Sequence, residues 1–270
     1  MKYYLSTIAD VDFEVVGNTE KITYKTRTAP AAQKYGIGLE LAEFCISENL
    51  DENMASILPH FESNRKSVSD AVLHAPYNEL YPHAIDPKAV KLARERYEKV
   101  WDICLRYDIS KIIVHANYVQ CLYYPEWFKE RSIEFWKSFL NAHPEDITIC
   151  MENVMETDPS LITDIIKSVN SPRLRMCLDA GHANLTGIKP EDWLTECAEY
   201  IDHYHIHNND GPALGDRPNL GDKHKALPNG TIDMKSLLTL AEKLTPNASA
   251  AVESYGIEES AAWLKENGFI

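Results

Sequence analysis

Short apolar runs alternate with longer helical patterns along this 270-residue sequence, and this alternation constrains the fold more than any other feature. Eight runs, rich in residues that favour β-strands, are predicted strands: Lys2–Ile8, Gly36–Phe44, Ala71–Tyr77, Lys111–Asn117, Asp146–Asn153, Leu174–Ala180, Asp202–Asn208 and Ser249–Tyr255. Helical patterns separate them, most clearly at Pro87–Tyr107, Pro125–Ala142, Pro159–Val169, Pro190–Tyr200, Met234–Leu244 and Glu258–Asn267, with a further helix expected at about Glu52–Lys66. Such an alternation predicts βαβ units and a parallel sheet.

Eight parallel strands joined by right-handed helical crossovers can close into a (β/α)8, or TIM, barrel, and this chain length is ordinary for one barrel. The alternative is a doubly wound open sheet, but no glycine-rich turn follows the first strand as a dinucleotide-binding fold would require. No linker rich in Pro, Gly or Ser divides the sequence, so residues 1–270 are predicted to form one α/β barrel domain. The longest irregular stretches, Ala9–Thr28 and Asn209–Thr231, are expected to be functional loops.

Composition narrows the class of protein. The formal net charge is −14, which opposes the phosphate contacts that drive non-specific nucleic-acid binding. The six cysteines form no CxxC pair, so a thiolate zinc site or redox motif is not indicated, and free thiols suit a reducing cytosol. No apolar run reaches the length of about 18 residues typical of a membrane span, and the first residues do not resemble a signal peptide. We therefore expect a soluble, cytoplasmic protein.

Polar side chains lie inside or just after most of the predicted strands. They are Glu40, His74, His115, Glu152, Asp179, His182, His205, His207 and Glu253, joined by Asp222 and His224 in the loop after the seventh strand. Burying a carboxylate or an imidazole costs several kcal/mol unless it is paired or bound to a metal. Because active sites of these barrels lie at the carboxyl ends of the strands, the side chains should converge there. Carboxylates and imidazoles that converge in this way indicate a divalent-metal site.

The pattern leaves several assignments open. Taken singly, His74 and His115 also fit hydrogen-bonded core residues, and Asp222 and His224 also fit a solvated loop. Strand alternation places His203, His205 and His207 on one face without choosing a ligand among them. Glu40 fits either a substrate-binding residue or a group that supports the site.

The segments LHAPY, VHAN, MEN, CLDAGHANL, YHIHNND, DKH, NGTID and VESY resemble the xylose isomerase-like barrel superfamily over about Leu39 to the C-terminus. This superfamily includes sugar isomerases, ketose 3-epimerases, inosose dehydratases and endonuclease IV. In its sugar-acting members, two glutamates, one aspartate and one histidine hold a metal ion. The resemblance implies that Glu152, Asp179, His205 and Glu253 are these ligands, and that Glu152 and Glu253 are also the catalytic acid and base. It implies zinc or manganese first, with magnesium, cobalt or iron as alternatives.

The resemblance extends to endonuclease IV, which holds three zinc ions with nine ligands. A matching residue is present at each position: His74, His115, Glu152, Asp179, His182, His205, Asp222, His224 and Glu253. The sequence departs from the pattern in two places. KALPNG stands where a turn like PLGEG commonly follows the Asp–His pair, and no DNA-binding loop is recognisable near the first strands.

The resemblance thus implies a divalent-metal-dependent isomerase or epimerase of a sugar or sugar phosphate. Glutamates would transfer a proton next to a carbonyl, through an enediolate that the metal stabilises. Arg217 and Glu40 are expected to contact the substrate, and His74, His115, His182, Asp222 and His224 to bind further metal or substrate.

Three alternatives remain: an endonuclease IV-like zinc phosphodiesterase acting on abasic DNA, a dehydratase of a cyclic polyol ketone, and a sugar-binding barrel without activity. The expected partner is a small sugar or sugar phosphate, with no membrane and no nucleic acid. A homo-oligomer is compatible with the superfamily, in which dimers and tetramers are common.

Overall fold

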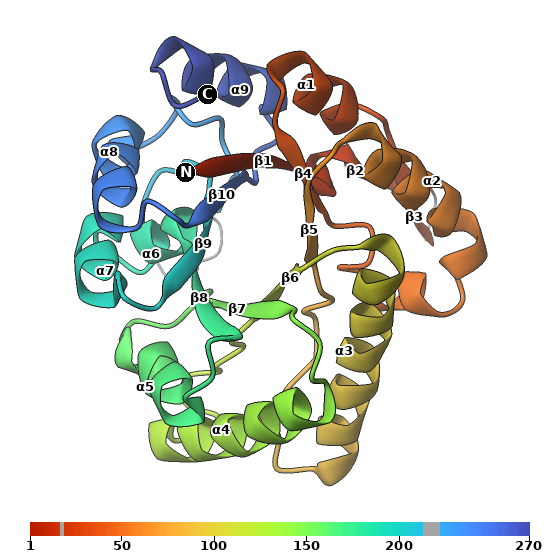
Figure 1. The fold of residues 1–270 in the computed structure, drawn as a ribbon, viewed down its shortest axis with the longest axis vertical. Coiled ribbons are helices and arrows are strands. Elements are labelled where there is room, and N and C mark those ends of the chain that lie inside the picture. Colours follow the sequence, from red (N-terminus) through yellow and green to blue (C-terminus); the bar gives the residue numbers. More distant parts are fainter. Residues whose placement is uncertain (17–18, 213–221) are drawn as a thin grey trace.

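Eight parallel strands close into a barrel in this computed structural model, which describes residues 1–16, 19–212 and 222–270. Around the ring the strands follow the order β1, β4, β5, β6, β7, β8, β9 and β10, with helices outside them (Figure 1). The barrel strands are β1 (Lys2–Ser6), β4 (Gly38–Leu41), β5 (Ala71–His74), β6 (Lys111–His115), β7 (Thr148–Glu152), β8 (Leu174–Asp179), β9 (Ile201–Ile206) and β10 (Ser249–Val252). The predicted (β/α)8 barrel is confirmed.

The helices lie where a barrel of this kind requires them, between successive strands. They are α1 (Thr28–Tyr35), α2 (Met54–Ser67), α3 (Pro87–Tyr107), α4 (Pro125–Ala142), α5 (Ser160–Val169), α6 (Ala180–Leu185), α7 (Pro190–Cys197), α8 (Met234–Leu244) and α9 (Ile257–Glu266), with short 3-10 turns η1 (Thr7–Asp10) and η2 (Ser47–Leu50). The predicted bounds of α3, α4 and α8 are confirmed. The predicted strands were too long, because the apolar runs continue into buried loops beyond the last ladder hydrogen bond.

The apolar core has two layers. The larger lies between strands and helices, where Trp101, Trp136 and Trp193 are almost fully buried. The smaller plugs the barrel interior and consists of Tyr4, Val72, Ile113, Cys150, Cys177 and Ala251. All six cysteines are free, and all except Cys121 are buried. None of the helices described is long and apolar enough to cross a membrane.

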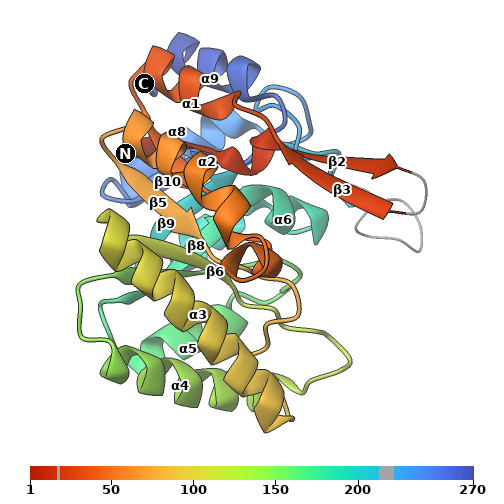
Figure 2. The ribbon, with the colours of Figure 1, turned by 90° about the vertical axis from the view of Figure 1, so that its right-hand side faces the viewer.

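The stretch Ala9–Thr28 is not the irregular loop that was expected. It contains an antiparallel hairpin of β2 (Val11–Val16) and β3 (Thr19–Tyr24), which projects beyond the barrel (Figure 2). Apolar and polar residues alternate in VDFEVV, and a Gly-Asn pair joins the two runs, so the sequence did carry a hairpin signal. Asp10 holds the segment that follows the hairpin, because its Oδ1 accepts hydrogen bonds from the backbone N–H groups of Arg27 (2.9 Å) and Thr28 (3.0 Å).

Helices α1 and α6 were also missed. The first has no strong apolar period, and the second starts directly at the end of β8, inside a run that looked like the strand's continuation. Asp179 caps α6 by accepting a hydrogen bond from the backbone N–H of His182 at 2.6 Å. The carboxyl end of β8 is therefore held by a helix from its first turn.

A buried carboxyl group lies near the base of the hairpin. Glu43 follows β4, is 1% exposed, and accepts a hydrogen bond from Asn64 of α2 at 2.7 Å. Burial, reinforced by the charge of Asp10, raises the pKa of Glu43 from 4.5 to about 7. The folded state therefore keeps this proton at pH values where the unfolded chain has released it.

We predict that Glu43→Gln stabilises the protein above neutral pH. The contribution of this carboxyl group to the free energy of unfolding is fully present below about pH 4.5 and is lost as pH rises through about 7. The stability that Glu43→Gln gains over the wild type should therefore be about 2 kcal/mol larger near pH 8 than near pH 5. Denaturant unfolding at the two pH values measures it, with the exposed Glu52→Gln as control. An equal change at both pH values would contradict the buried, protonated state of Glu43.

Candidate metal and catalytic site

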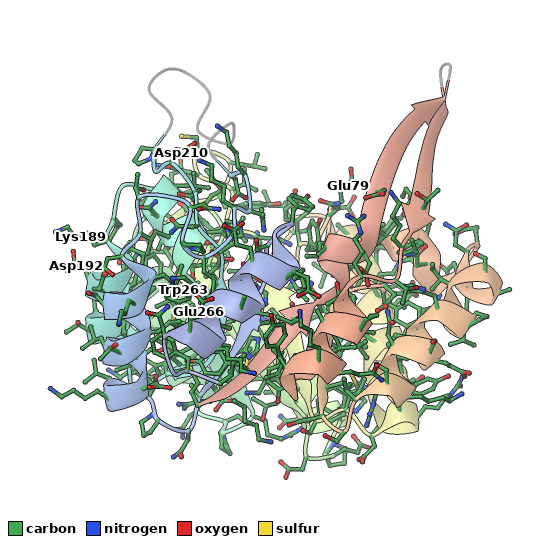
Figure 3. The ribbon with its side chains drawn as sticks, turned by 90° about the horizontal axis from the view of Figure 1, so that it is seen from above. Glu79, Lys189, Asp192, Asp210, Trp263 and Glu266 are labelled. Atoms are coloured by element: carbon green, nitrogen blue, oxygen red, sulfur yellow. The ribbon has the colours of Figure 1, made fainter. Side chains whose placement is uncertain are left out.

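The polar side chains predicted at the strand ends meet at one end of the barrel. Figure 3 shows that Glu79 and Asp210, which follow β5 and β9, lie on the same side of the molecule as the projecting hairpin. This is the carboxyl end of the strands, where the apolar layer of the interior gives way to carboxylates and imidazoles.

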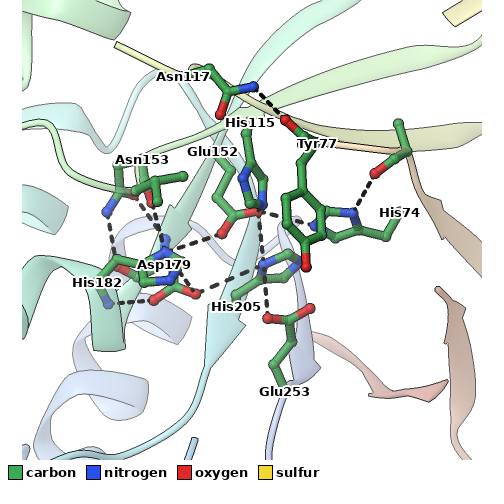
Figure 4. A network of polar contacts seen from close by, with 12 residues as sticks. His74, Tyr77, His115, Asn117, Glu152, Asn153, Asp179, His182, His205 and Glu253 are labelled. Atoms are coloured by element: carbon green, nitrogen blue, oxygen red, sulfur yellow. Dashed lines mark hydrogen bonds and ion pairs between the residues drawn. The ribbon is translucent and has the colours of Figure 1, made fainter. Parts of the chain in front are cut away.

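Glu152, the last residue of β7, lies at the centre of the site and is fully buried. Its Oε2 is 3.1 Å from His205 Nδ1 and 3.4 Å from both His74 Nε2 and His115 Nε2, and its Oε1 is 3.2 Å from His182 Nδ1 (Figure 4). Burial alone would raise the pKa of Glu152, but these imidazoles hold it well below its usual range. Glu152 is therefore an anion held by four histidines.

Asp179 presents one carboxylate oxygen to the site. Its Oδ1 caps α6, while its Oδ2 lies 3.9 Å from His205 Nδ1. Asn153 fixes the backbone here, because its side chain accepts a hydrogen bond from Asp179 N at 2.9 Å and donates to Asp179 O at 3.0 Å. The N-cap geometry thus selects which oxygen faces His205.

The donor atoms fit a divalent ion. Glu152 Oε1, Asp179 Oδ2 and His205 Nδ1 are buried and have no hydrogen-bond partner within the described part of the chain. Glu253 Oε2 completes the set at 3.7 Å from His205 Nδ1. Bonds of about 2.0–2.2 Å to one ion place ligand atoms about 3–3.5 Å apart, close to these separations. Three buried carboxylates around one imidazole are otherwise costly, so the residues present suit a bound cation.

Glu253 differs from Glu152 in its surroundings. It follows β10 and lines a cavity of about 400 Å³ together with His74, His115 and Tyr77. Burial raises the pKa of Glu253 above its ordinary value, against the attraction of His205 and with the repulsion of Glu40. The two glutamates are therefore unlike: one is held as an anion and the other readily holds a proton.

Tyr77 forms part of the cavity wall and stacks on His115, with ring centroids 4.4 Å apart. Asn117 holds the turn that carries this tyrosine, because its side chain donates to Tyr77 O and to Leu80 O, each at 2.9 Å. No sequence pattern indicated this pair, since the two contacts depend on how loops from β5 and β6 meet.

His203 and His205 of β9, and His207 directly after it, point to one side as predicted, and all three are fully buried. His205 Nε2 lies 2.9 Å from Glu40 Oε2, so its other nitrogen, Nδ1, faces Glu152. Glu40 is fully buried beneath the site and is not among the residues that line the cavity. Its placement favours support of His205 over contact with a substrate.

A second cluster lies beside the first. Asp222 Oδ2 is 3.4 Å from His182 Nε2 and 3.3 Å from His224 Nε2, and His224 holds a φ of 40°, a strained value for a residue other than glycine. His207, which had no predicted role, joins this cluster: its ring stacks on His224 at 3.9 Å, and its Nδ1 is 3.8 Å from Asp222 Oδ1. Strand alternation placed His207 on the correct face but could not show this contact.

All nine positions shared with endonuclease IV converge, in three neighbouring groups. The first joins His74, His115 and Glu152, the second is the set around His205, and the third joins His182, Asp222 and His224. Arg217, the other residue expected to contact the substrate, lies outside the described residues.

This chain belongs to the family of xylose isomerase-like TIM barrels, which it matches over residues 46–267. It is 23% identical over 202 residues to an uncharacterized protein of Methanocaldococcus jannaschii, covering 71% of this chain, and 26% identical over 193 residues to a probable endonuclease 4 of Metamycoplasma arthritidis, covering 65%. Each match covers 66% of the relative, so this chain spans about two thirds of the length of these curated relatives.

Solved structures show the same fold. A D-tagatose 3-epimerase-like protein superimposes with a TM-score of 0.76 at 20% identity, over 99% of this chain and 97% of that one. The D-allulose 3-epimerase of Methylomonas sp. gives 0.71 at 13%, covering 99% and 98%. A protein of Thermus thermophilus, solved after soaking with zinc chloride, gives 0.68 at 21%, covering 89% and 92%.

We predict that Gly181→Ala is strongly destabilising because of His207. A methyl group at position 181 would lie 2.0 Å from His207 Cε1 and 2.2 Å from Nε2, and the ring is confined between Asp179 and Asp222. Overpacking of this kind typically costs about 1–3 kcal/mol. Unfolding of Gly181→Ala, His207→Ala and the double variant measures it. The double variant should lose clearly less than the sum of the two, and simple additivity would show that the clash is absent.

Proposed function

We propose that this chain is a divalent-metal-dependent isomerase or epimerase of a small sugar. The observation that supports this most is the pair of unlike glutamates, Glu152 and Glu253, which lie 3.1 and 3.7 Å from His205 Nδ1, with Glu253 lining a cavity of about 400 Å³. A pocket of that size suits a small polar molecule such as a monosaccharide. The family to which the chain belongs, and the epimerases that share its fold, support the same class of substrate.

Glu152, Asp179, His205 and Glu253 would hold the ion, with zinc or manganese as the first candidates. Bound there, a divalent ion supplies a Lewis acid that polarises a substrate carbonyl and the neighbouring hydroxyl. Glu253, whose pKa is raised, lies at the cavity and would remove the proton from the carbon next to the carbonyl, so that the electrons of the C–H bond move toward the carbonyl oxygen.

Return of a proton completes the reaction. Glu253, which follows β10, can return the proton that it has taken, whereas Glu152, at the end of β7, would have to take up a proton before it could deliver one to the opposite face. Delivery to the opposite face of the same carbon gives the epimer, and delivery to the neighbouring carbon gives the isomer. His74, His115 and His182 also line the cavity and would hydrogen-bond the sugar hydroxyls. A dehydratase of a cyclic polyol ketone would begin with the same proton abstraction.

We predict that Glu253→Gln abolishes proton exchange while the fold and metal binding persist in part. Loss of a general base typically lowers the rate by about 10²–10⁴-fold. The metal-loaded protein is incubated with ketohexoses and ketopentoses in D2O, and deuterium next to the carbonyl is followed by NMR. The exposed Glu266→Gln is the control. A product lighter by one water would identify the dehydratase, and absence of deuterium uptake from every ketose and cyclic polyol ketone would overturn the proposal.

The convergence of all nine positions supports a second candidate, a zinc phosphodiesterase acting on abasic DNA, as does the similarity to a probable endonuclease 4. The net charge of −14 weighs against it because phosphate contacts need cationic surface.

For the nuclease we predict about three zinc ions per chain, and loss of incision at an abasic site in Asp222→Ala, because the third group then loses its shared carboxylate. The sugar enzyme should instead keep deuterium exchange within about tenfold in the same variant, since Asp222 lies outside the set around His205. Metal analysis and a duplex incision assay decide between them, and incision that survives in Asp222→Ala would exclude a nuclease that depends on the third group. The cytoplasmic location and a homo-oligomeric state stay predictions.

A further inference from the structure

A chain of polar side chains continues below His205 through the barrel interior. His205 Nε2 and His203 Nε2 both contact Glu40 Oε2, at 2.9 and 3.1 Å. His203 Nδ1 lies 2.7 Å from Ser249 Oγ, which lies 2.8 Å from Lys111 Nζ. Barrel interiors are normally filled by apolar side chains, so five polar residues in one connected line need a reason.

The chain joins the proposed metal site to the opposite end of the barrel. Lys111 and Ser249 are the first residues of β6 and β10, and Lys111 Nζ also contacts the backbone oxygen and the carboxylate of Asp202, each at 2.8 Å. The side chain of Asp202 is 32% exposed, whereas Glu40, His203 and His205 are fully buried. One end of the chain therefore reaches solvent and the other is a residue of the metal site.

The direction of each hydrogen bond follows from the chemistry of the groups. An ammonium group can only donate, so Lys111 donates to Ser249 Oγ. His203 Nε2 lies 3.1 Å from a carboxylate oxygen of Glu40. Nε2 therefore carries an N–H and donates it, because a carboxylate only accepts, and Nδ1 is left for Ser249.

The donors thus converge on Glu40 from both sides. Passing a proton along such a line would require every hydrogen bond to reverse, so the arrangement suits positioning and not conduction. For His205 it has one consequence: if Nε2 donates to Glu40, the lone pair of Nδ1 is turned toward Glu152, Asp179 and Glu253. A lone pair that faces three carboxylates is favourable only when a cation lies between them.

We propose that Glu40 and His203 are positioning residues that fix His205 as its Nε2–H tautomer and so reserve Nδ1 for the metal ion. This inference rests on the metal site of the proposed function. A carboxylate behind a ligating imidazole makes that imidazole a stronger ligand, and loss of such a partner typically lowers metal affinity about 10–100-fold. Glu40 also needs His203, because its Oε1 has no hydrogen-bond partner among the residues described and an anion with one donor would be poorly compensated.

Glu40→Gln tests the proposal with zinc alone and no sugar. The matched control is Glu43→Gln, an equally buried glutamate three positions further on that makes no contact with His205 among those described. We expect Glu40→Gln to weaken zinc binding about 10–100-fold in a chelator competition, and Glu43→Gln to change it by less than about threefold. His203→Leu should also weaken binding, whereas His203→Gln, which keeps an N–H donor, should recover much of the affinity.

A spectroscopic measurement separates positioning from a general loss of structure. In the zinc-loaded wild type, ¹⁵N NMR should show His205 protonated at Nε2 and metal-bound at Nδ1. In cobalt-loaded Glu40→Gln, the visible ligand-field bands should shift while circular dichroism stays that of a folded barrel.

Unchanged zinc affinity in folded Glu40→Gln, metal bound through Nε2 of His205, or a wild type that takes up no divalent ion would each overturn the inference. A weakened zinc site in a protein that turns over no sugar would leave the inference standing and overturn only the proposed function.

Discussion

The carboxylate of Glu152 organises the carboxyl end of this barrel. Its two oxygens lie 3.1–3.4 Å from imidazoles carried by β5, β6, α6 and β9. A carboxylate that is buried to this depth is costly unless it has such partners. The ends of β5, β6, β7 and β9 must therefore lie at the same level along the barrel axis. The register of the barrel and the composition of the site thus constrain each other.

The surroundings of Glu152 and Glu253 shift their pKa values in opposite directions. Glu152 lies close to four histidines and its pKa is lowered, while Glu253 borders the cavity and its pKa is raised. Two chemically identical groups within one site thus differ because of what surrounds them.

The sequence predicted the barrel and the convergence of Glu152, Asp179, His205 and Glu253 because polar residues in apolar strand ends are costly and therefore conspicuous. It did not show how Glu40 pairs with His203 and His205, since β4 and β9 are separated by two strands in the ring and no local pattern connects them. It predicted the face of His207 but not its neighbours, which come from a loop and from α6. Helix α6 itself was hidden because its cap, Asp179, is also the last residue of a strand.

Gly181 is not a proposed metal ligand. The space that a side chain at this position would need is filled by the ring of His207. A side chain at position 181 would clash with the imidazole at position 207, so His207 depends on a glycine at position 181. Gly181 therefore determines whether this end of the barrel can carry a histidine at position 207. In the divergence of such barrels, a single small residue can act as the permissive step that must come before a further imidazole is gained.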